Sequence, residues 1–391
     1  MTVYDVGGVL CARPFRLGRL GHIGISVDDL ALTERFYREV LGFRVTDHLY
    51  EPGGSPSPLG TFLTYNSDHH AMVLADTAAA KARGFNAPGL TLNQISFQVS
   101  TLQEVVEAHE MFVADGLSIR AIGRDIPGSN WAVYVADPDG HPVELFYGME
   151  QIGWDGRSKP SGFRRYRATE PPKLPRPAER DEIQDVINLG LSIADGHVWN
   201  DVGEATYDVG GVLLPRPFKV INSGPIGLFV QDLDASISFY LDRLGMAVTE
   251  EGTCLGERLV HLRSGTEHHT ITLMPISLRA KLGLSDRSTL ATYGMQVGSY
   301  RQLRDARRFL AEQGYSVLEL PPEIHAGIDF AIHVVDPEGH CVQLYYELEQ
   351  VGSSGRPLSP RERRVVPDVW PEQLDPPTAT SPNRTFQGPL G

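Results

Sequence analysis

A long internal repeat limits the possible folds of this chain more than any other feature. The segment YDVGGVLCARPF at 4–15 returns as YDVGGVLLPRPF at 207–218, and FYREVLGFRVT at 36–46 returns at the same spacing as FYLDRLGMAVT at 239–249. The turn sequence DPDGH at 137–141 returns as DPEGH at 336–340 after a slippage of a few residues. A repeat of this length indicates two homologous domains rather than an array of short units.

The repeat also sets the domain boundaries. We predict a first domain at 1–152, a linker with a helix at 153–206, a second domain at 207–351, and a tail at 352–391 that runs over the surface or is disordered. The proline-rich EPPKLPRP marks the linker, and the residues that follow it have helical spacing. The tail is rich in Pro, Ser and Arg, which disfavours a packed core.

Each domain divides again into two similar modules. The segments 20–43 and 92–117 both read as an alternating strand, a helix and a glycine that ends the helix. Short β-rich runs follow at 60–76 and 130–147. The order βαβββ therefore occurs four times, which predicts an α+β fold whose paired modules curve their sheets around a cleft.

The composition favours a small-molecule function. The chain has 391 residues, 41% of them hydrophobic, and a net charge of −14, which argues against binding to nucleic acid or to an anionic membrane. We find neither a signal peptide nor an apolar run long enough for a membrane span, so we expect a cytoplasmic protein. Cys11, Cys254 and Cys341 are widely spaced, and we expect free thiols.

The most specific motif is VYVADPDGHPVE at 133–144, in which Tyr134 precedes Glu144 on the next predicted strand. This motif resembles the signature of the extradiol ring-cleaving dioxygenases, a group within the vicinal oxygen chelate superfamily. The resemblance covers all four modules, and GHIGISV places His22 where that family has its first metal-binding histidine. The segment YNSDHH at 65–70 resembles the one that carries a catalytic histidine, which is His70 here.

The resemblance implies a metal site formed by His22, Gln94 and Glu144. Two neutral donors and one carboxylate on one face are typical of non-haem Fe(II). The family has a histidine where this chain has Gln94 in LNQISFQV. An amide oxygen is a weaker and harder donor than imidazole, so Mn, Zn or Ni remain alternatives to Fe(II). Related glyoxalases also use glutamine as a ligand.

The resemblance further implies a catechol-like aromatic substrate, O₂ as co-substrate and a homo-oligomeric enzyme. His70 would stabilise reduced oxygen and transfer a proton, since a histidine can titrate near neutral pH. Tyr134 would hydrogen-bond the substrate oxygen. The segment GRDIPGSNWAV departs from the family because it lacks a histidine that would contact substrate or oxygen.

The second domain lacks the expected ligands. Pro225, Thr292 and Gln343 stand where the first domain has His22, Gln94 and Glu144. We therefore expect the first domain to carry the reaction and the second to have a degenerate metal site.

Several motifs have simpler interpretations. His141 recurs inside its turn as His340, which favours a structural role, and the DVGG stretches lack the strand and helix context of a phosphate loop. Glu144 lies on an apolar strand, where an unpaired carboxylate would be costly, and this favours a metal partner. Two other functions remain open: a non-redox glyoxalase-like isomerase or lyase, and a metal-free protein that binds a small aromatic compound.

Overall fold

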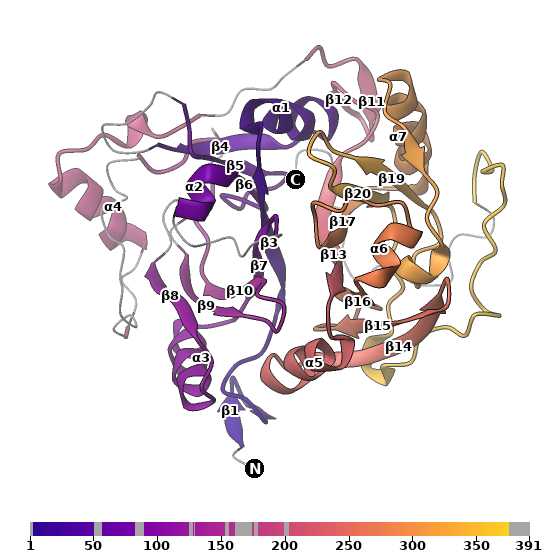
Figure 1. Cartoon of the computed structure of the whole chain (residues 1–391). Helices are drawn as coiled ribbons and strands as arrows, with labels where there is room; N and C mark the ends of the chain where they lie inside the picture. Colours follow the sequence, from indigo (N-terminus) through magenta and orange to yellow (C-terminus); the bar gives the residue numbers. More distant parts are fainter. Residues whose placement is uncertain are drawn as a thin grey trace. The chain divides into compact units, whose positions relative to one another are not determined.

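The computed structural model describes residues 3–50, 57–82, 90–124, 128, 130–152, 156–160, 174–175, 179–198 and 203–374. These residues form two compact units (Figure 1). The first unit comprises the described residues within 1–30, 44–87 and 92–201, and the second comprises those within 31–43, 88–91 and 202–391. Most of the predicted linker sequence EPPKLPRP lies outside the described residues.

Each unit contains one eight-stranded mixed sheet. In the first unit the strand order is β4-β5-β6-β3-β7-β10-β9-β8. The parallel pairs are β3 with β6 and β7 with β10, and the antiparallel pair β3–β7 joins the two modules. The strands are β3 (Arg19–Val27), β4 (Arg44–Leu49), β5 (Gly60–Thr64), β6 (Met72–Asp76), β7 (Leu92–Gln98), β8 (Ile119–Arg124), β9 (Trp131–Ala136) and β10 (Pro142–Tyr147).

The second unit repeats this topology as β14-β15-β16-β13-β17-β20-β19-β18. The predicted α+β fold of four βαβββ modules is therefore confirmed. The strands are β13 (Val220–Val230), β14 (Ala247–Cys254), β15 (Glu257–Arg263), β16 (Ile271–Pro275), β17 (Leu290–Val297), β18 (Val317–Leu318), β19 (Ala331–Val335) and β20 (Cys341–Tyr345).

The long helix of each second module begins at a side-chain cap. Thr101 accepts a hydrogen bond from the Glu104 amide, while the Glu104 carboxylate accepts one from the amide of Ser100, the residue before the cap. Ser299 caps the other long helix with its side chain as well.

The α-helices are α1 (Leu30–Arg35), α2 (Thr77–Ala82), α3 (Leu102–Ala114), α4 (Glu179–Asn188), α5 (Leu233–Ser238), α6 (Ser277–Lys281) and α7 (Tyr300–Glu312). The π-helical turns are η1 (Phe36–Val40) and η4 (Phe239–Arg243), and the 3₁₀ turns are η3 (Ile193–Asp195), η5 (Pro322–His325) and η6 (Gly352–Ser354). Among the described residues, none of these helices has the length and apolar character needed to cross a bilayer.

The repeated DVGG sequence forms a small hairpin in each unit. In the first, β1 (Tyr4–Val6) pairs with β2 (Val9–Cys11), and in the second, β11 (Tyr207–Val209) pairs with β12 (Val212–Leu214). Gly7 and Gly8 both have positive φ, at 61° and 83°, as a type I′ turn requires. These glycines therefore serve a hairpin turn and not a phosphate-binding loop.

The helical segment 31–43 lies in the first sequence repeat but belongs by its contacts to the second unit. The Tyr37 hydroxyl donates a hydrogen bond to Asp336 Oδ2 (3.0 Å), and the ring of Phe36 packs edge-on against Tyr315. Burial, together with the nearby Asp336 carboxylate, raises the pKa of Tyr37 well above 10, so the phenol stays protonated.

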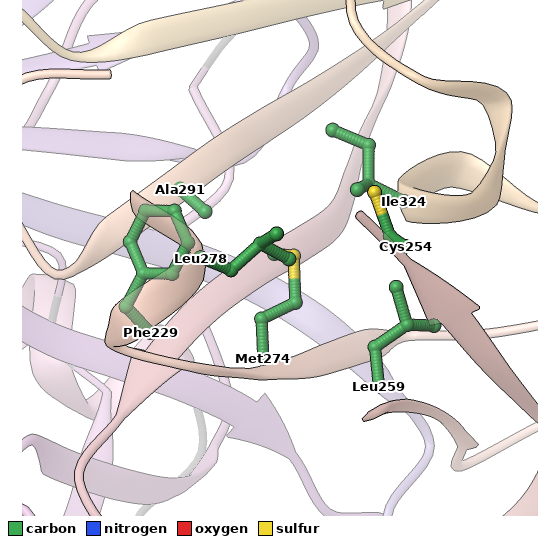
Figure 2. Packing of buried hydrophobic residues seen from close by; sticks show 7 residues of the cluster. All are labelled: Phe229, Cys254, Leu259, Met274, Leu278, Ala291 and Ile324. Carbon is green, nitrogen blue, oxygen red and sulfur yellow. The ribbon is translucent and has the colours of Figure 1, made fainter. Parts of the chain in front are cut away.

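One face of the second sheet is filled by apolar side chains, and Figure 2 shows the cluster. Phe229 on β13 pairs with Met274 on β16, next to Leu259 on β15. In the first unit, Ser26 on β3 and Gly60 on β5 both pair with Ala75 on β6. The same positions of the repeat thus carry large apolar residues in the second unit and small residues in the first. The other cluster members are Cys254, Leu278, Ala291 and Ile324.

The described part of the tail packs against the second unit. Trp370 contacts the ring of Phe330 at a centroid distance of 5.0 Å, and the Tyr300 hydroxyl donates to the Pro371 carbonyl (2.6 Å). Arg363 forms an ion pair with Glu250 on β14.

Candidate functional site

His22 and Glu144 meet on one face of the first sheet. Ser96 on β7 pairs with His22 on β3 and with Glu144 on β10, so these three side chains form one row across neighbouring strands. His22 is 1% exposed and Glu144 is fully buried. His22 Nε2 lies 2.9 Å from Glu144 Oε2.

The environment of this pair fits a metal ion. Glu144 Oε2 accepts a hydrogen bond from the Ser96 hydroxyl, and Oε1 accepts one from Asn130 Nδ2 (2.8 Å). Neither ring nitrogen of His22 has a hydrogen-bond partner among the described residues, although Nε2 is close to the carboxylate. When two ligand atoms each lie about 2.1 Å from a metal ion and the ligand–metal–ligand angle is about 90°, the two atoms are about 3 Å apart. The 2.9 Å separation matches this geometry.

His70 lies beside this pair. Its ring centroid is 4.3 Å from that of His22 and 5.2 Å from that of Phe62. Its Nδ1 is 3.0 Å from His69 Nδ1. Burial, reinforced by the neighbouring His22 and His69, lowers the pKa of His70 well below 6.5. The buried ring is therefore neutral at pH 7.

Tyr134 lies on the same face, because it pairs directly with Glu144 across β9 and β10. It is 4% exposed and packs with Ala132 and Phe146. The ring of Phe146 lies 4.9 Å from that of His22. Tyr134 is thus part of the wall of the site.

Gln94 is on the same face but further along β7, where it pairs with Gly24. The Glu144 carboxylate contacts the side chains of His22, Ser96 and Asn130. The sequence analysis missed Ser96 and Asn130. The two-residue period of a strand places Ser96 on the face of Gln94 and is a signal that could have identified it.

His141 has a structural role, as expected. Its amide and its Nδ1 both contact the Asp137 carboxylate, at 2.8 Å each, within the turn before β10. His340 and Asp336 repeat this arrangement in the second unit.

The second unit has Pro225, Thr292 and Gln343 at the positions of the three predicted ligands, as the sequence indicated. Gln343 Oε1 is 2.9 Å from His333 Nε2, so the amide that replaces the carboxylate is hydrogen-bonded to a histidine. A different group gathers nearby. Among the described residues, the one set of three His, Cys, Asp or Glu side chains close enough to hold a metal is His261, His268 and His269.

Gly128 limits the space around His70 and provides a test. Its φ is +97°, and a Cβ atom added there would lie 2.7 Å from His70 Cε1. We expect Gly128→Ala to displace the His70 ring and to lower kcat at least about tenfold, because the group that would move the proton is misplaced. Metal content should change less than activity, because the added atom meets Asn130 only at an ordinary contact distance of 3.4 Å.

Gly327→Ala is the matched control. Gly327 has a φ of +81°, and its added Cβ would meet His268 in the second unit at 2.7 Å. The backbone strain is similar in both variants, about 1 kcal/mol or more. Equal activity losses in the two variants would show that Gly128 acts only through stability.

Comparison with known proteins agrees with this architecture. A model of the Glyoxalase/Bleomycin resistance protein/Dioxygenase superfamily matches residues 19–145 and 223–344. The 2,2',3-trihydroxybiphenyl dioxygenase of Sphingomonas paucimobilis is 29% identical over 135 residues, which cover 34% of this chain and 42% of that protein. The chain thus spans about two-fifths of the length of the curated relatives that it matches.

Solved structures share the fold at low identity. The 2,2',3-trihydroxybiphenyl 1,2-dioxygenase of Sphingomonas wittichii strain RW1 is 16% identical, with a TM-score of 0.53, over 86% of this chain and 93% of that one. The Mn(II)-bound glyoxalase of Novosphingobium aromaticivorans is 15% identical, with a TM-score of 0.55, over 87% of this chain and 85% of that one.

Proposed function

Because the chain belongs to the Glyoxalase/Bleomycin resistance protein/Dioxygenase superfamily, we propose that its first domain is an extradiol-type dioxygenase that cleaves a catecholic ring with O₂ at a non-haem Fe(II) site. One observation carries this proposal. Glu144 is fully buried, and its oxygen lies 2.9 Å from a His22 nitrogen that has no hydrogen-bond partner among the described residues. Such a pair would be costly without a shared cation.

His22 and Glu144 would hold the metal, with Gln94 as the third ligand. When bound, the metal supplies the redox chemistry that joins O₂ to a chelated catechol. Ser96 and Asn130 occupy one lone pair on each Glu144 oxygen and so fix the carboxylate orientation, as outer partners of metal ligands commonly do.

The other side chains act on protons and on water. His70 is neutral, so it can accept a proton from a substrate hydroxyl and return it later. Tyr134 can donate its phenolic hydrogen to a substrate oxygen. The rings of Phe62 and Phe146 lie beside His70 and His22 and would keep bulk water away from these groups.

A non-redox, glyoxalase-like isomerase or lyase is the second candidate. It is favoured by Gln94, whose amide oxygen suits a harder metal such as Mn(II) better than imidazole does. The similarity in fold to an Mn(II)-bound glyoxalase is compatible with it. A metal-free protein that binds a small aromatic compound is the third.

Metal analysis of protein purified without oxygen separates these candidates. We expect Fe(II) in the first domain, and oxygen consumption with a ring-fission colour when 2,3-dihydroxybiphenyl or catechol is added in air. Bound Mn(II) with no oxygen uptake would favour the glyoxalase-like function. Tight binding of a catechol by protein that takes up no metal would favour the third candidate.

The small residues on the first sheet suggest where a substrate could lie. Ala75 occupies the position of Met274, which is fully buried in the apolar cluster of the second unit (Figure 2). We expect Ala75→Met to lower kcat/KM for 2,3-dihydroxybiphenyl about tenfold and to leave catechol less affected, because the longer side chain fills space that only the larger substrate needs. Equal losses for the two substrates would contradict this placement.

A further inference from the structure

Three buried histidines gather in the second domain. His261 lies on β15, and His268 and His269 lie in the loop before β16, with exposures of 1%, 0% and 2%. One ring nitrogen from each lies within 4.8 Å of the other two. We propose that His261, His268 and His269 bind a late divalent metal ion, with Zn²⁺ as the best fit, at a second centre distinct from the one in the first domain.

The hydrogen bond of His261 fixes which nitrogen is available. Its Nε2 lies 3.1 Å from the Glu323 carbonyl oxygen, which can only accept. Nε2 therefore carries the hydrogen, and Nδ1 of the neutral ring has a free lone pair, 2.9 Å from the Thr272 hydroxyl. That hydroxyl can rotate away when a cation takes its place.

His268 is held in the same way by a carboxylate. Its Nε2 lies 3.0 Å from Glu250 Oε2. Glu250 also forms an ion pair with Arg363, whose Nη2 lies 3.2 Å from the same His268 nitrogen. When His268 Nε2 donates to Glu250, Nδ1 of His268 is the nitrogen left to bind a metal.

These two outer contacts are the pattern found around metal-binding histidines. Such a ligand almost always donates its other ring N–H to a carboxylate or a backbone carbonyl, which orients the ring and raises its basicity. His268 has the carboxylate of Glu250, and His261 has the carbonyl of Glu323. The two Nδ1 atoms thus lie on the side of the rings away from these outer partners, where Thr272 and His269 contact them in the absence of a metal.

The third ligand completes the set through a change of tautomer. Nδ1 of His269 is 3.0 Å from Nδ1 of His268, and a single hydrogen lies between them. When a metal ion binds between the two Nδ1 atoms, this hydrogen leaves Nδ1 of His269 and Nε2 of the same ring is protonated instead. The ring stays neutral, and no net proton is released. Two ligands of one ion are about 3 Å apart, as observed.

The charges around the cluster favour an ion that imidazole binds well. Burial lowers the pKa of His261 to about 3 and that of His269 well below 6.5, so both rings are neutral, the form that binds metals. Neutral nitrogen donors without a coordinating carboxylate favour Zn²⁺, Cu²⁺, Ni²⁺ or Co²⁺ over Ca²⁺ and Mg²⁺. Arg363 is a nearby cation, and its charge is offset by the ion pair with Glu250.

The first domain contains a natural control for this centre. It repeats the histidine pair, since His69 Nδ1 is 3.0 Å from His70 Nδ1. Phe62 takes the place of His261, with its ring 5.5 Å from that of His69. His261→Phe therefore installs a residue that the same fold already accepts at this position, and it removes one ligand without adding a charge.

The test is a titration of chelator-treated, full-length protein with Zn²⁺ by calorimetry and with Co²⁺ by visible absorption. In a Glu144→Gln background, which isolates the second centre, we expect one equivalent of metal bound, and none after His261→Phe is added. His261→Phe alone should leave the ring cleavage of the first domain unchanged. A protein that binds as many equivalents after the His261→Phe substitution as before it overturns the proposal.

Two further measurements keep the outcome clear. His261→Leu removes the ring donor without introducing an aromatic ring and should lose the metal just as His261→Phe does; if it keeps the metal, the proposal fails. X-ray absorption of Zn²⁺ bound to Glu144→Gln should show three imidazole ligands, and fewer than three would overturn it. If the first domain binds no metal in these titrations, wild-type protein should still bind one ion. This binding should require His261 but not Glu144. The proposal for the second domain is therefore tested independently of the proposed function.

Discussion

Glu144→Gln is expected to remove the metal of the first domain and to lower kcat/KM for catechol cleavage at least about a hundredfold, or roughly 3 kcal/mol of transition-state stabilisation. The amide has no negative charge to offset the cation. The fold should be intact, because the second domain already has Gln343 at the corresponding position of β20, where it is 2% exposed. Iron content, circular dichroism and oxygen uptake measure the three effects.

Gln343→Glu is the matched control. It creates the carboxylate in the second domain, but Pro225 still stands where the histidine would be needed. We expect no change in oxygen uptake. Full iron occupancy in Glu144→Gln would mean that the carboxylate is not a ligand, and the site proposed for the first domain would be wrong.

Gln94→His is expected to raise Fe(II) affinity at least about tenfold, because it completes a set of two histidines and one carboxylate and because imidazole is the stronger donor. Gln94→Ala should weaken binding instead. Both are measured by anaerobic titration of metal-free protein with Fe(II), followed by addition of oxygen and a catechol. Gly24 pairs with Gln94, and because it has no side chain the Gln94 Cγ atom can lie 2.8 Å from where a Cβ of residue 24 would be.

The outcomes of this series separate three interpretations. Equal iron binding by wild type and both variants would place Gln94 outside the metal site and leave Ser96, which already contacts Glu144, as the nearest alternative on β7. Iron binding that only the histidine variant gains would mean that the natural protein uses another metal or none. Ser96→Ala tests the site as a whole, since it removes the hydroxyl that contacts the carboxylate and should weaken metal binding about tenfold or more.

The sequence by itself determined the architecture and the two central residues of the candidate site. The repeat and the periods of strand and helix are local patterns, and they predicted four βαβββ modules, as both sheets confirm. His22 and Glu144 were selected from their motifs, and the sheet places them in contact. That selection was possible because the segments around both residues resemble the metal-binding motifs of the extradiol dioxygenases.

Only the tertiary structure decided which side chains complete each site. The strand period places Ser96 on the face of Gln94, but only the register of β7 with β10 brings it to Glu144, and Asn130 reaches the other carboxylate oxygen from a loop position that no local pattern encodes. In the same way, the sequence shows that His268 and His269 repeat an earlier pair, but only the pairing of β15 with β16 reveals that His261 faces them. A contact between residues far apart in the chain depends on register, and a shift of one residue would turn His261 to the other face of its sheet.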